Sequence, residues 1–196
     1  MVDPAILLGG ELVLLDPWLA DAEATAMERA ILAEITPRQE SIVLFGRQVL
    51  QPRLSLWMGD AAYRYSGRRF EPEPWTPAVR ELRQRVEERA GCRFNSVLVN
   101  LYRDGRDAMG MHADDEPELG PRPVIASVSF GAARRFVMKP KRANDMARRE
   151  LLLRHGSLLV MKGDTQRTWL HAVPRAAHVQ TSRLNLTFRE ILRPSG

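Results

Sequence analysis

The sequence predicts an α+β fold in which two helices pack on one face of a β-sandwich or jelly roll. Two early segments carry apolar residues at helical spacing, and most later segments are short, strand-like and separated by turn signals. Helices that precede a long series of strands are typical of this class, because they can cover one face of the sheet that the strands form. A length of 196 residues suits one domain.

A short apolar strand is expected at residues 11–15, and a helix from about residue 20 to residue 35. Met27 and Ile31 lie on one stripe of that helix, and Pro37 follows its end. The next segment, residues 41–50, is predicted to form two short strands that are interrupted at Phe45 and Gly46. Residues 51–77 are rich in Pro, Gly and aromatic residues, which predicts loops with a strand near residues 61–65.

The second helix has clear boundaries. Thr76 can cap it, Pro77 suits its first position, and Gly91 ends it. Between them Val79, Leu82 and Val86 share one face. Six later segments have the pattern of strands: residues 97–101, 124–130, 135–139, 150–154, 157–161 and 183–191.

Charge and composition indicate which kinds of partner and which cell compartment the protein can have. The net charge is +5, and residues 131–155 hold eight basic side chains against two acidic ones. Such a stretch is either a solvated surface or a site for phosphates. No apolar run approaches the ~18 residues of a membrane span. The single cysteine, Cys92, excludes an intramolecular disulfide, so we expect the protein in the cytoplasm, or in the nucleus of a eukaryote. We also expect a monomer.

His112 and Asp114 lie two residues apart, so in an extended segment their side chains point to the same side. His171 stands far along the chain and can supply a third ligand. Two histidines and one carboxylate form the facial triad of non-haem Fe(II) oxygenases, which leaves metal positions open for a chelating cosubstrate and O2.

A polar row alternates with apolar residues near the end of the chain. Leu184, Leu186 and Phe188 occupy one face of the predicted strand, and the other face carries Arg183, Asn185, Thr187 and Arg189. If two guanidinium groups point inward they require an anionic partner, and a dicarboxylate would supply one.

These residues resemble the AlkB family of Fe(II)- and 2-oxoglutarate-dependent dioxygenases that dealkylate nucleic acids. The resemblance rests on the two histidines, Asp114 and the polar row, on the N-x-Y-x-D-G signature at residues 100–105, and on residues 123–131 and 155–159. It extends from about Val43 to Ile191. It implies a double-stranded β-helix core at residues 91–196, preceded by a nucleotide-recognition hairpin or lid with a supporting helix at 41–90 and an N-terminal strand and helix at 1–40.

The resemblance also implies a role for each residue. His112, Asp114 and His171 would ligate Fe(II), Arg183 would pair with the distal carboxylate of 2-oxoglutarate, and Arg189 would lie near its keto-acid end. The other expected cosubstrate contacts are Asn100, Tyr102, Asn185 and Thr187. The implied reaction removes alkyl groups from 1-methyladenine and 3-methylcytosine in DNA, consumes O2 and 2-oxoglutarate, and releases formaldehyde and succinate.

Residues 43–67 resemble more specifically the animal members of that family that repair duplex DNA. By this match Phe45 would fill the gap left by a flipped base, and Tyr65 would stack on that base. The remaining expected substrate contacts are Arg53, Tyr63 and Glu116. One departure concerns residues 174–182, where those relatives carry a basic cluster and this chain has only Arg175.

Three alternatives remain open at this point. The same core could demethylate RNA, which would require contacts to 2′-hydroxyl groups, or it could hydroxylate a protein. A nucleic-acid-binding module without catalysis is the third. It would not need the metal triad and both arginines, so the sequence favours an enzyme that acts on double- or single-stranded alkylated DNA.

Phe45→Ala separates the two DNA substrates. We expect about tenfold lower activity on methylated double-stranded DNA, since unstacking a base costs a few kcal/mol, and little change on single strands, where no gap needs filling. Initial rates of formaldehyde release on matched oligonucleotides measure this. An equal loss on both substrates would show that Phe45 is a core residue.

Overall fold

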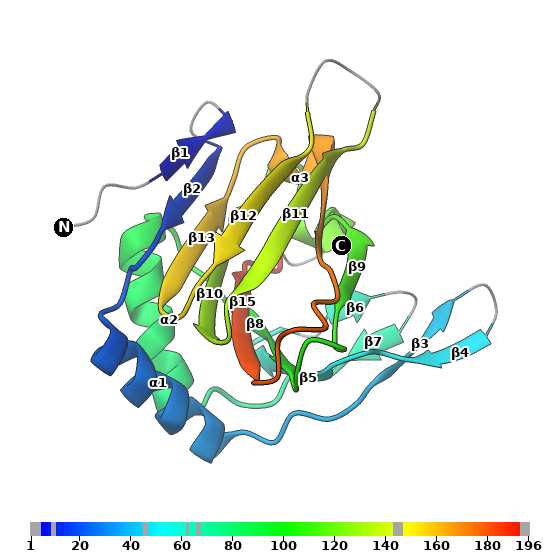
Figure 1. Cartoon of the computed structure of the whole chain (residues 1–196). Helices are drawn as coiled ribbons and strands as arrows, with labels where there is room; N and C mark the ends of the chain where they lie inside the picture. The colour runs from blue at the N-terminus through cyan, green and yellow to red at the C-terminus, as the bar shows by residue number, and fades with distance from the viewer. Residues whose placement is uncertain are drawn as a thin grey trace.

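The computed structural model describes residues 5–8, 11–44, 47–61, 63–65, 68–142 and 147–192. Two β-sheets face each other, and two helices cover the outer face of the larger sheet (Figure 1). This is the predicted α+β jelly roll. Within the described residues, no helix is both long enough and apolar enough to cross a membrane.

The larger sheet has seven strands, and each neighbouring pair is antiparallel. Its strands in spatial order are β1 (Ala5–Leu7), β2 (Leu12–Leu15), β13 (Ser157–Met161), β10 (Ile125–Gly131), β15 (Arg183–Arg189), β8 (Ser96–Tyr102) and β5 (Leu54–Gly59). The polar row of the sequence therefore lies on β15, near the centre of the sheet, where both neighbouring strands can contribute side chains to the same face.

The smaller sheet has four antiparallel strands: β12 (Arg149–Leu153), β11 (Arg134–Pro140), β14 (Trp169–Val173) and β9 (Met109–His112). Two strand pairs lie outside the sheets, β3 (Ser41–Leu44) with β4 (Arg47–Leu50) and β6 (Tyr63–Tyr65) with β7 (Arg68–Phe70). The β3–β4 pair projects beyond the sheets in Figure 1.

The helices are α1 (Asp21–Glu34) and α2 (Pro77–Ala90), close to the predicted boundaries. Gly91 ends α2 with φ of 70°, a left-handed conformation that glycine adopts without strain. Thr76 stands at the N-cap position, but its side chain makes no capping hydrogen bond, so this part of the prediction is wrong. The described residues also form the short helical turns η2 (Pro117–Leu119) and α3 (Thr165–Thr168).

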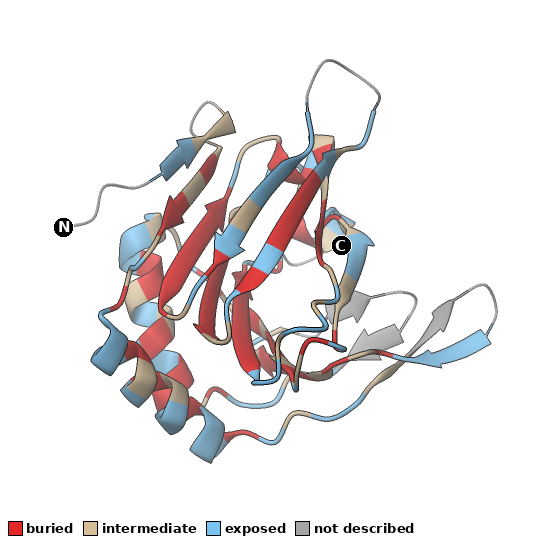
Figure 2. Cartoon of the chain, viewed as in Figure 1, coloured by how far each residue is buried: buried red, intermediate tan, exposed pale blue. Residues whose placement is uncertain are grey.

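Strand alternation divides the apolar residues between two cores. Leu184, Leu186 and Phe188 of β15 pack against the helices with Val79 and Leu82 of α2. A second core fills the space between the two sheets and includes residues of both, such as Leu159 and Phe136. Figure 2 shows the buried residues concentrated along the strands of the larger sheet and the inward sides of the helices. The opposite face of β15, with its four polar residues, therefore points into the space between the sheets.

Five strands were not predicted: β1, β5, β7, β9 and β14. β5 lies in the segment expected to be mostly loops, because flanking Pro and Gly residues obscured its six-residue pattern. β9 and β14 have four and five residues, too few for alternation to stand out from neighbouring turns. The strand expected near residues 61–65 is limited to β6, which pairs with β7.

Not every basic residue of the stretch 131–155 is available as a surface charge, and Arg134 is the exception. It is buried, and its guanidinium donates hydrogen bonds to the backbone carbonyls of Asp104, Asp107 and Pro174, at 2.7 to 3.2 Å. A cation held in this way is structural and cannot contact phosphates. It joins the start of β11 to two loops, because the alternation of β11 turns Arg134 inward and Arg135 outward.

Arg134→Met should destabilise the fold by about 3 kcal/mol, since three buried carbonyls would lose their donors. For a chain of this length that corresponds to a fall of roughly 6–12 °C in the melting temperature. Arg135→Met is the matched control, because Arg135 is exposed, and it should change the melting temperature by less than about 2 °C. Similar melting temperatures for the two variants would contradict the assignment.

Candidate metal centre and its two cavities

His112 and His171 are brought together by the smaller sheet. They are directly paired residues on β9 and β14, and their rings lie 4.3 Å apart between centroids. Asp114 follows two residues after His112, and the ligand atoms of the three side chains all lie within 4.8 Å of one another. The sequence prediction that these three residues converge on one point therefore agrees with the geometry.

Each side chain is held by its neighbours. The Nδ1 of His112 lies 2.9 Å from the carbonyl oxygen of Gly110, so a proton on Nδ1 makes this bond and leaves Nε2 for a metal. Phe136 stacks on the ring of His171 at 5.2 Å. The backbone N–H of Asp114 donates to Oε1 of Gln166 at 3.0 Å, which fixes the loop after β9.

Asp114 has one oxygen committed and one available. Nη2 of Arg189 donates to Oδ1 at 2.8 Å. Within the described part of the chain, the buried Oδ2 accepts no hydrogen bond, and it lies 3.8 Å from Nε2 of His171. A buried carboxylate oxygen that faces two imidazoles without a proton donor fits a cation at this point.

The electrostatics give the protonation states that a metal requires. Burial alone would raise the pKa of Asp114, but the positive charge of Arg189 and interactions with the two histidines hold it well below its usual range. Burial, with repulsion from His112, lowers the pKa of His171 to about 3. At neutral pH the site therefore offers a carboxylate and a neutral imidazole, which are the forms that bind metals.

An inner cavity adjoins this cluster between the two sheets. Strand register explains its lining, because Arg183 pairs with Tyr102 and Asn185 pairs with Asn100 across β15 and β8. All six predicted cosubstrate residues line this cavity: Asn100, Tyr102, Arg183, Asn185, Thr187 and Arg189. Ser127 on the other neighbouring strand, β10, also lines it.

Arg183 is the strongest anion-binding feature of the inner cavity. Its side chain is buried, and Nη2 donates to Oγ of Ser129 at 2.9 Å. Nε and Nη1 have no hydrogen-bond partner in the part of the chain that the structure describes. Burial lowers the pKa of Arg183, which reflects the cost of enclosing a cation, and a bound carboxylate would offset that cost through two parallel hydrogen bonds.

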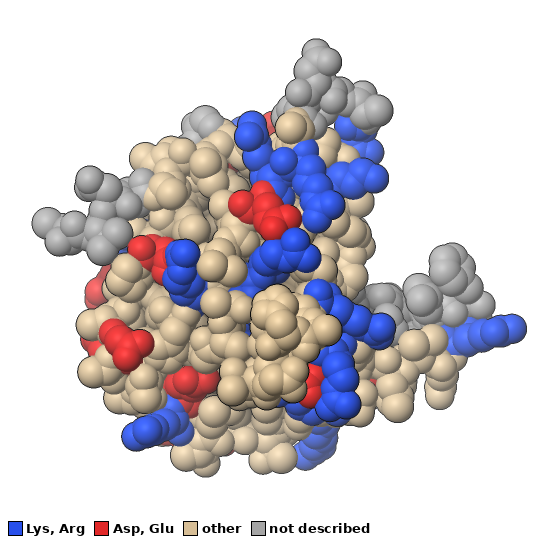
Figure 3. Space-filling view, viewed as in Figure 1, with Lys and Arg blue, Asp and Glu red and all other residues tan. Residues whose placement is uncertain are grey.

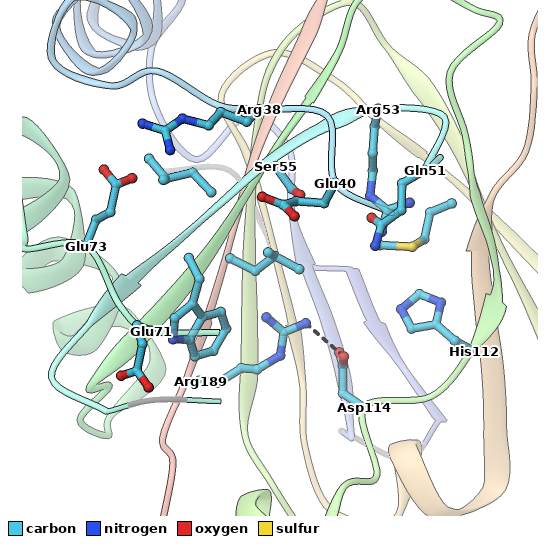
Figure 4. Close-up of a pocket in the computed structure, with 14 residues that line it drawn as sticks. Arg38, Glu40, Gln51, Arg53, Ser55, Glu71, Glu73, His112, Asp114 and Arg189 are labelled. Atoms are coloured by element: carbon cyan, nitrogen blue, oxygen red, sulfur yellow. Dashed lines mark hydrogen bonds and ion pairs between the residues drawn. The ribbon is translucent and has the colours of Figure 1, made fainter. Parts of the chain in front are cut away.

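An outer cavity of about 220 Å³ opens on the other side of the three candidate metal ligands. Met109, His112, Asp114 and Arg189 line both cavities, so the cluster lies at their junction. Figure 4 shows the outer cavity, with His112 and Asp114 at one end and polar side chains from the chain before α2 around it. The polar residues contributed by that segment are Arg38, Glu40, Gln51, Arg53, Ser55, Glu71 and Glu73.

The predicted substrate contacts have mixed outcomes. Arg53 lines the outer cavity, where Nε donates to Oδ1 of Asn100 at 2.8 Å. Glu116 is half-buried at the start of η2 and is not among the residues that line either cavity. Phe45 and the side chains of Tyr63 and Tyr65 lie outside the described residues, so their roles stay predictions.

Sequence reasoning missed several residues of the site. Ser127 and Ser129 could have been found, since alternation places both on one face of β10. Gln166 and Phe136 carried no such signal, because their roles depend on which loop and which strand lie beside the histidines. The carboxylates Glu40, Glu71 and Glu73 and the amide of Gln51 were likewise missed as cavity residues.

Comparison with known proteins agrees with this geometry. Residues 11–189 match the family model described as the 2OG-Fe(II) oxygenase superfamily. The alpha-ketoglutarate-dependent dioxygenase alkB homolog 3 of Homo sapiens is 47% identical over 149 residues, covering 72% of this chain and 52% of the relative. The DNA oxidative demethylase ALKBH2 of Mus musculus is 42% identical over 184 residues, covering 87% and 76%.

The chain thus spans about half the length of the human alkB homolog 3. Among solved structures, that of OsALKBH1 matches with a TM-score of 0.61 and 19% sequence identity, covering 97% of this chain and 98% of the other. At this identity the likeness supports the fold alone.

His112→Ala should lower the affinity for Mn(II) at least tenfold, because it removes one of three protein ligands. Isothermal titration of the metal-free protein at neutral pH measures the change. His178→Ala is the matched control, since His178 is exposed on a loop, and it should bind Mn(II) as the unchanged protein does. Equal affinities in all three proteins would place the metal elsewhere.

Proposed function

The chain belongs to the 2OG-Fe(II) oxygenase superfamily, and on that premise we propose that it oxidatively removes alkyl groups from damaged bases in DNA. The resemblance to the AlkB family is confirmed by relatives named alkB homolog 3 and ALKBH2. The family implies Fe(II), 2-oxoglutarate and O2 as reactants. The substrates that we propose are 1-methyladenine and 3-methylcytosine.

This proposal rests on the position of His112, Asp114 and His171 between the two cavities. An oxidation that couples a cosubstrate to a separate substrate needs both molecules at one metal, on different sides of it. The inner cavity has a buried arginine, Arg183, whose Nε and Nη1 have no hydrogen-bond partner among the described residues, as a dicarboxylate requires. The outer cavity is larger and reaches His112 and Asp114 from the other side.

The chain's own residues hold and orient the reactants. Arg183 would bind the distal carboxylate of 2-oxoglutarate, with Tyr102 beneath the guanidinium at 5.1 Å from its ring centroid. Asn185 is oriented by hydrogen bonds to Ser127 and to the carbonyl of Val128, each 2.8 Å. His112, Asp114 and His171 would hold Fe(II), which with O2 and 2-oxoglutarate supplies the oxidising power that hydroxylates the N-alkyl carbon, so that the alkyl group leaves as an aldehyde.

A basic surface next to the site supports a nucleic-acid substrate. Lys and Arg side chains gather over β11 and β12 in Figure 3. The exposed members are Arg135, Lys139, Lys141, Arg142, Arg148, Arg149 and Arg154. Four of these already pair with acidic side chains, namely Arg135 and Arg148 with Glu150, Lys141 with Asp115, and Arg154 with Asp16. Lys139, Arg142 and Arg149 are therefore the side chains we propose for phosphate contacts.

The proposal is tested by mixing the protein with Fe(II), 2-oxoglutarate and single- or double-stranded oligonucleotides that carry one methylated base, and measuring formaldehyde. Release that requires both Fe(II) and 2-oxoglutarate is expected. Matched RNA and an unmodified strand serve as comparisons. Formaldehyde from RNA alone would replace DNA by RNA as the substrate, and its absence from every methylated strand would contradict the proposal.

Arg183→Lys should raise the KM for 2-oxoglutarate at least tenfold, because lysine keeps the charge but loses the fork that binds a carboxylate at two points. The affinity for DNA should change by less than about twofold, since Arg183 does not line the outer cavity. Arg80→Lys on the exposed side of α2 is the matched control. A parallel loss of 2-oxoglutarate and DNA binding would contradict this role.

A further inference from the structure

Gln51 is held firmly where the chain leaves β4 and enters the cavity wall. Its backbone N–H donates to the carbonyl of Glu40 at 2.8 Å, and its own carbonyl accepts from Nε2 of Gln39 at 2.9 Å. These two hydrogen bonds fix the backbone from which the side chain projects. It is only 4% exposed, yet it lines the outer cavity together with His112 and Asp114.

The amide of Gln51 has an open acceptor. Its Oε1 is buried and has no hydrogen-bond partner within the described part of the chain. In Figure 4 the side chain extends into the cavity on the same side as His112. A buried amide oxygen without a donor destabilises a fold unless a ligand supplies the donor, so this atom indicates a bound molecule with an N–H or O–H group near the metal.

The charged side chains of the outer cavity discriminate little between ligands. Four carboxylates line this cavity, those of Glu40, Glu71, Glu73 and Asp114, and three arginines, Arg38, Arg53 and Arg189. Asp114 is already paired with Arg189, so three glutamates remain against two arginines. This excess of one carboxylate gives a cationic ligand little from the wall as a whole. Selection among ligands of similar size therefore falls to hydrogen bonds with buried groups, where one unsatisfied partner costs most.

We propose that Gln51 determines substrate specificity by accepting a hydrogen bond from the exocyclic amino group next to the alkylated ring nitrogen. This inference rests on the proposed function and refines it. In 3-methylcytosine and 1-methyladenine an amino group adjoins the methylated nitrogen. In 3-methylthymine a carbonyl oxygen stands there instead, and it would oppose Oε1. Gln51 thus favours bases that present a donor beside the lesion.

Two variants separate hydrogen bonding from packing. Gln51→Met keeps the length of the side chain and removes the amide, whereas Gln51→Glu keeps an acceptor at the same place. The kcat/KM of each is measured on single strands with one 3-methylcytosine and on matched strands with one 3-methylthymine. We expect Gln51→Met to lower kcat/KM for 3-methylcytosine about tenfold, and to lower its ratio over 3-methylthymine by a similar factor.

Gln51→Glu should retain kcat/KM for 3-methylcytosine within about threefold, because its carboxylate still accepts. The KM for 2-oxoglutarate should not change in either variant, which separates this role from a structural one. Gln180→Met serves as the matched control, since Gln180 is exposed and bonds only its own loop at Ala177. It should retain both activities.

Two outcomes overturn the assignment of Gln51 alone. One is an equal loss for 3-methylcytosine in Gln51→Met and Gln51→Glu, and the other is no loss in Gln51→Met. If Gln51→Met does not fold, a tenfold loss for 3-methylcytosine in a folded Gln51→Glu likewise overturns it, and retention supports it. Failure of the proposed function is distinct, because the unchanged protein would then release no formaldehyde from any methylated strand.

Discussion

Arg189 and Asp114 form an ion pair of 2.8 Å in which both side chains are almost completely buried. Arg189 belongs to β15 of the larger sheet, and Asp114 follows β9 of the smaller one, so the pair joins the two sheets at the metal centre. Burying either charge alone would be unfavourable by several kcal/mol. Because Arg189 occupies Oδ1, the second oxygen of Asp114 is left facing the histidines, and Asp114 remains ionised.

The same pair stands at the boundary between the two cavities, both of which it lines. On the inner side, β15 continues as Thr187, Asn185 and Arg183, so one strand carries side chains from the metal to the far end of the cosubstrate cavity. On the outer side, most of the wall comes from the chain between α1 and α2, which lies outside the two large sheets except for β5. A fixed core with a separate outer wall lets substrate recognition vary while the metal and cosubstrate sites stay constant.

Local patterns in the sequence were sufficient to predict features that depend on neighbouring residues, such as the faces of a strand and the boundaries of a helix. Alternation placed Arg183, Asn185, Thr187 and Arg189 on one face, and helical spacing with Gly91 located α2. Alternation does not say which strands are neighbours, so the pairing of Asn185 with Asn100 and of His171 with His112 was not predicted. Only the family resemblance assigned these residues to one site. The Arg189–Asp114 pair, the three carbonyl bonds of Arg134 and the position of Gln51 depend on long-range contacts, and the sequence alone did not indicate them.

A crystal structure with Mn(II) and 2-oxoglutarate, with the metal located by anomalous diffraction, tests the central arrangement most directly. We expect one metal with atoms of His112, Asp114 and His171 at about 2.0–2.3 Å, and the distal carboxylate of 2-oxoglutarate at Nε and Nη1 of Arg183 in the inner cavity. The outer cavity should remain free for a base. A metal bound away from these three residues, or 2-oxoglutarate bound in the outer cavity, would contradict it.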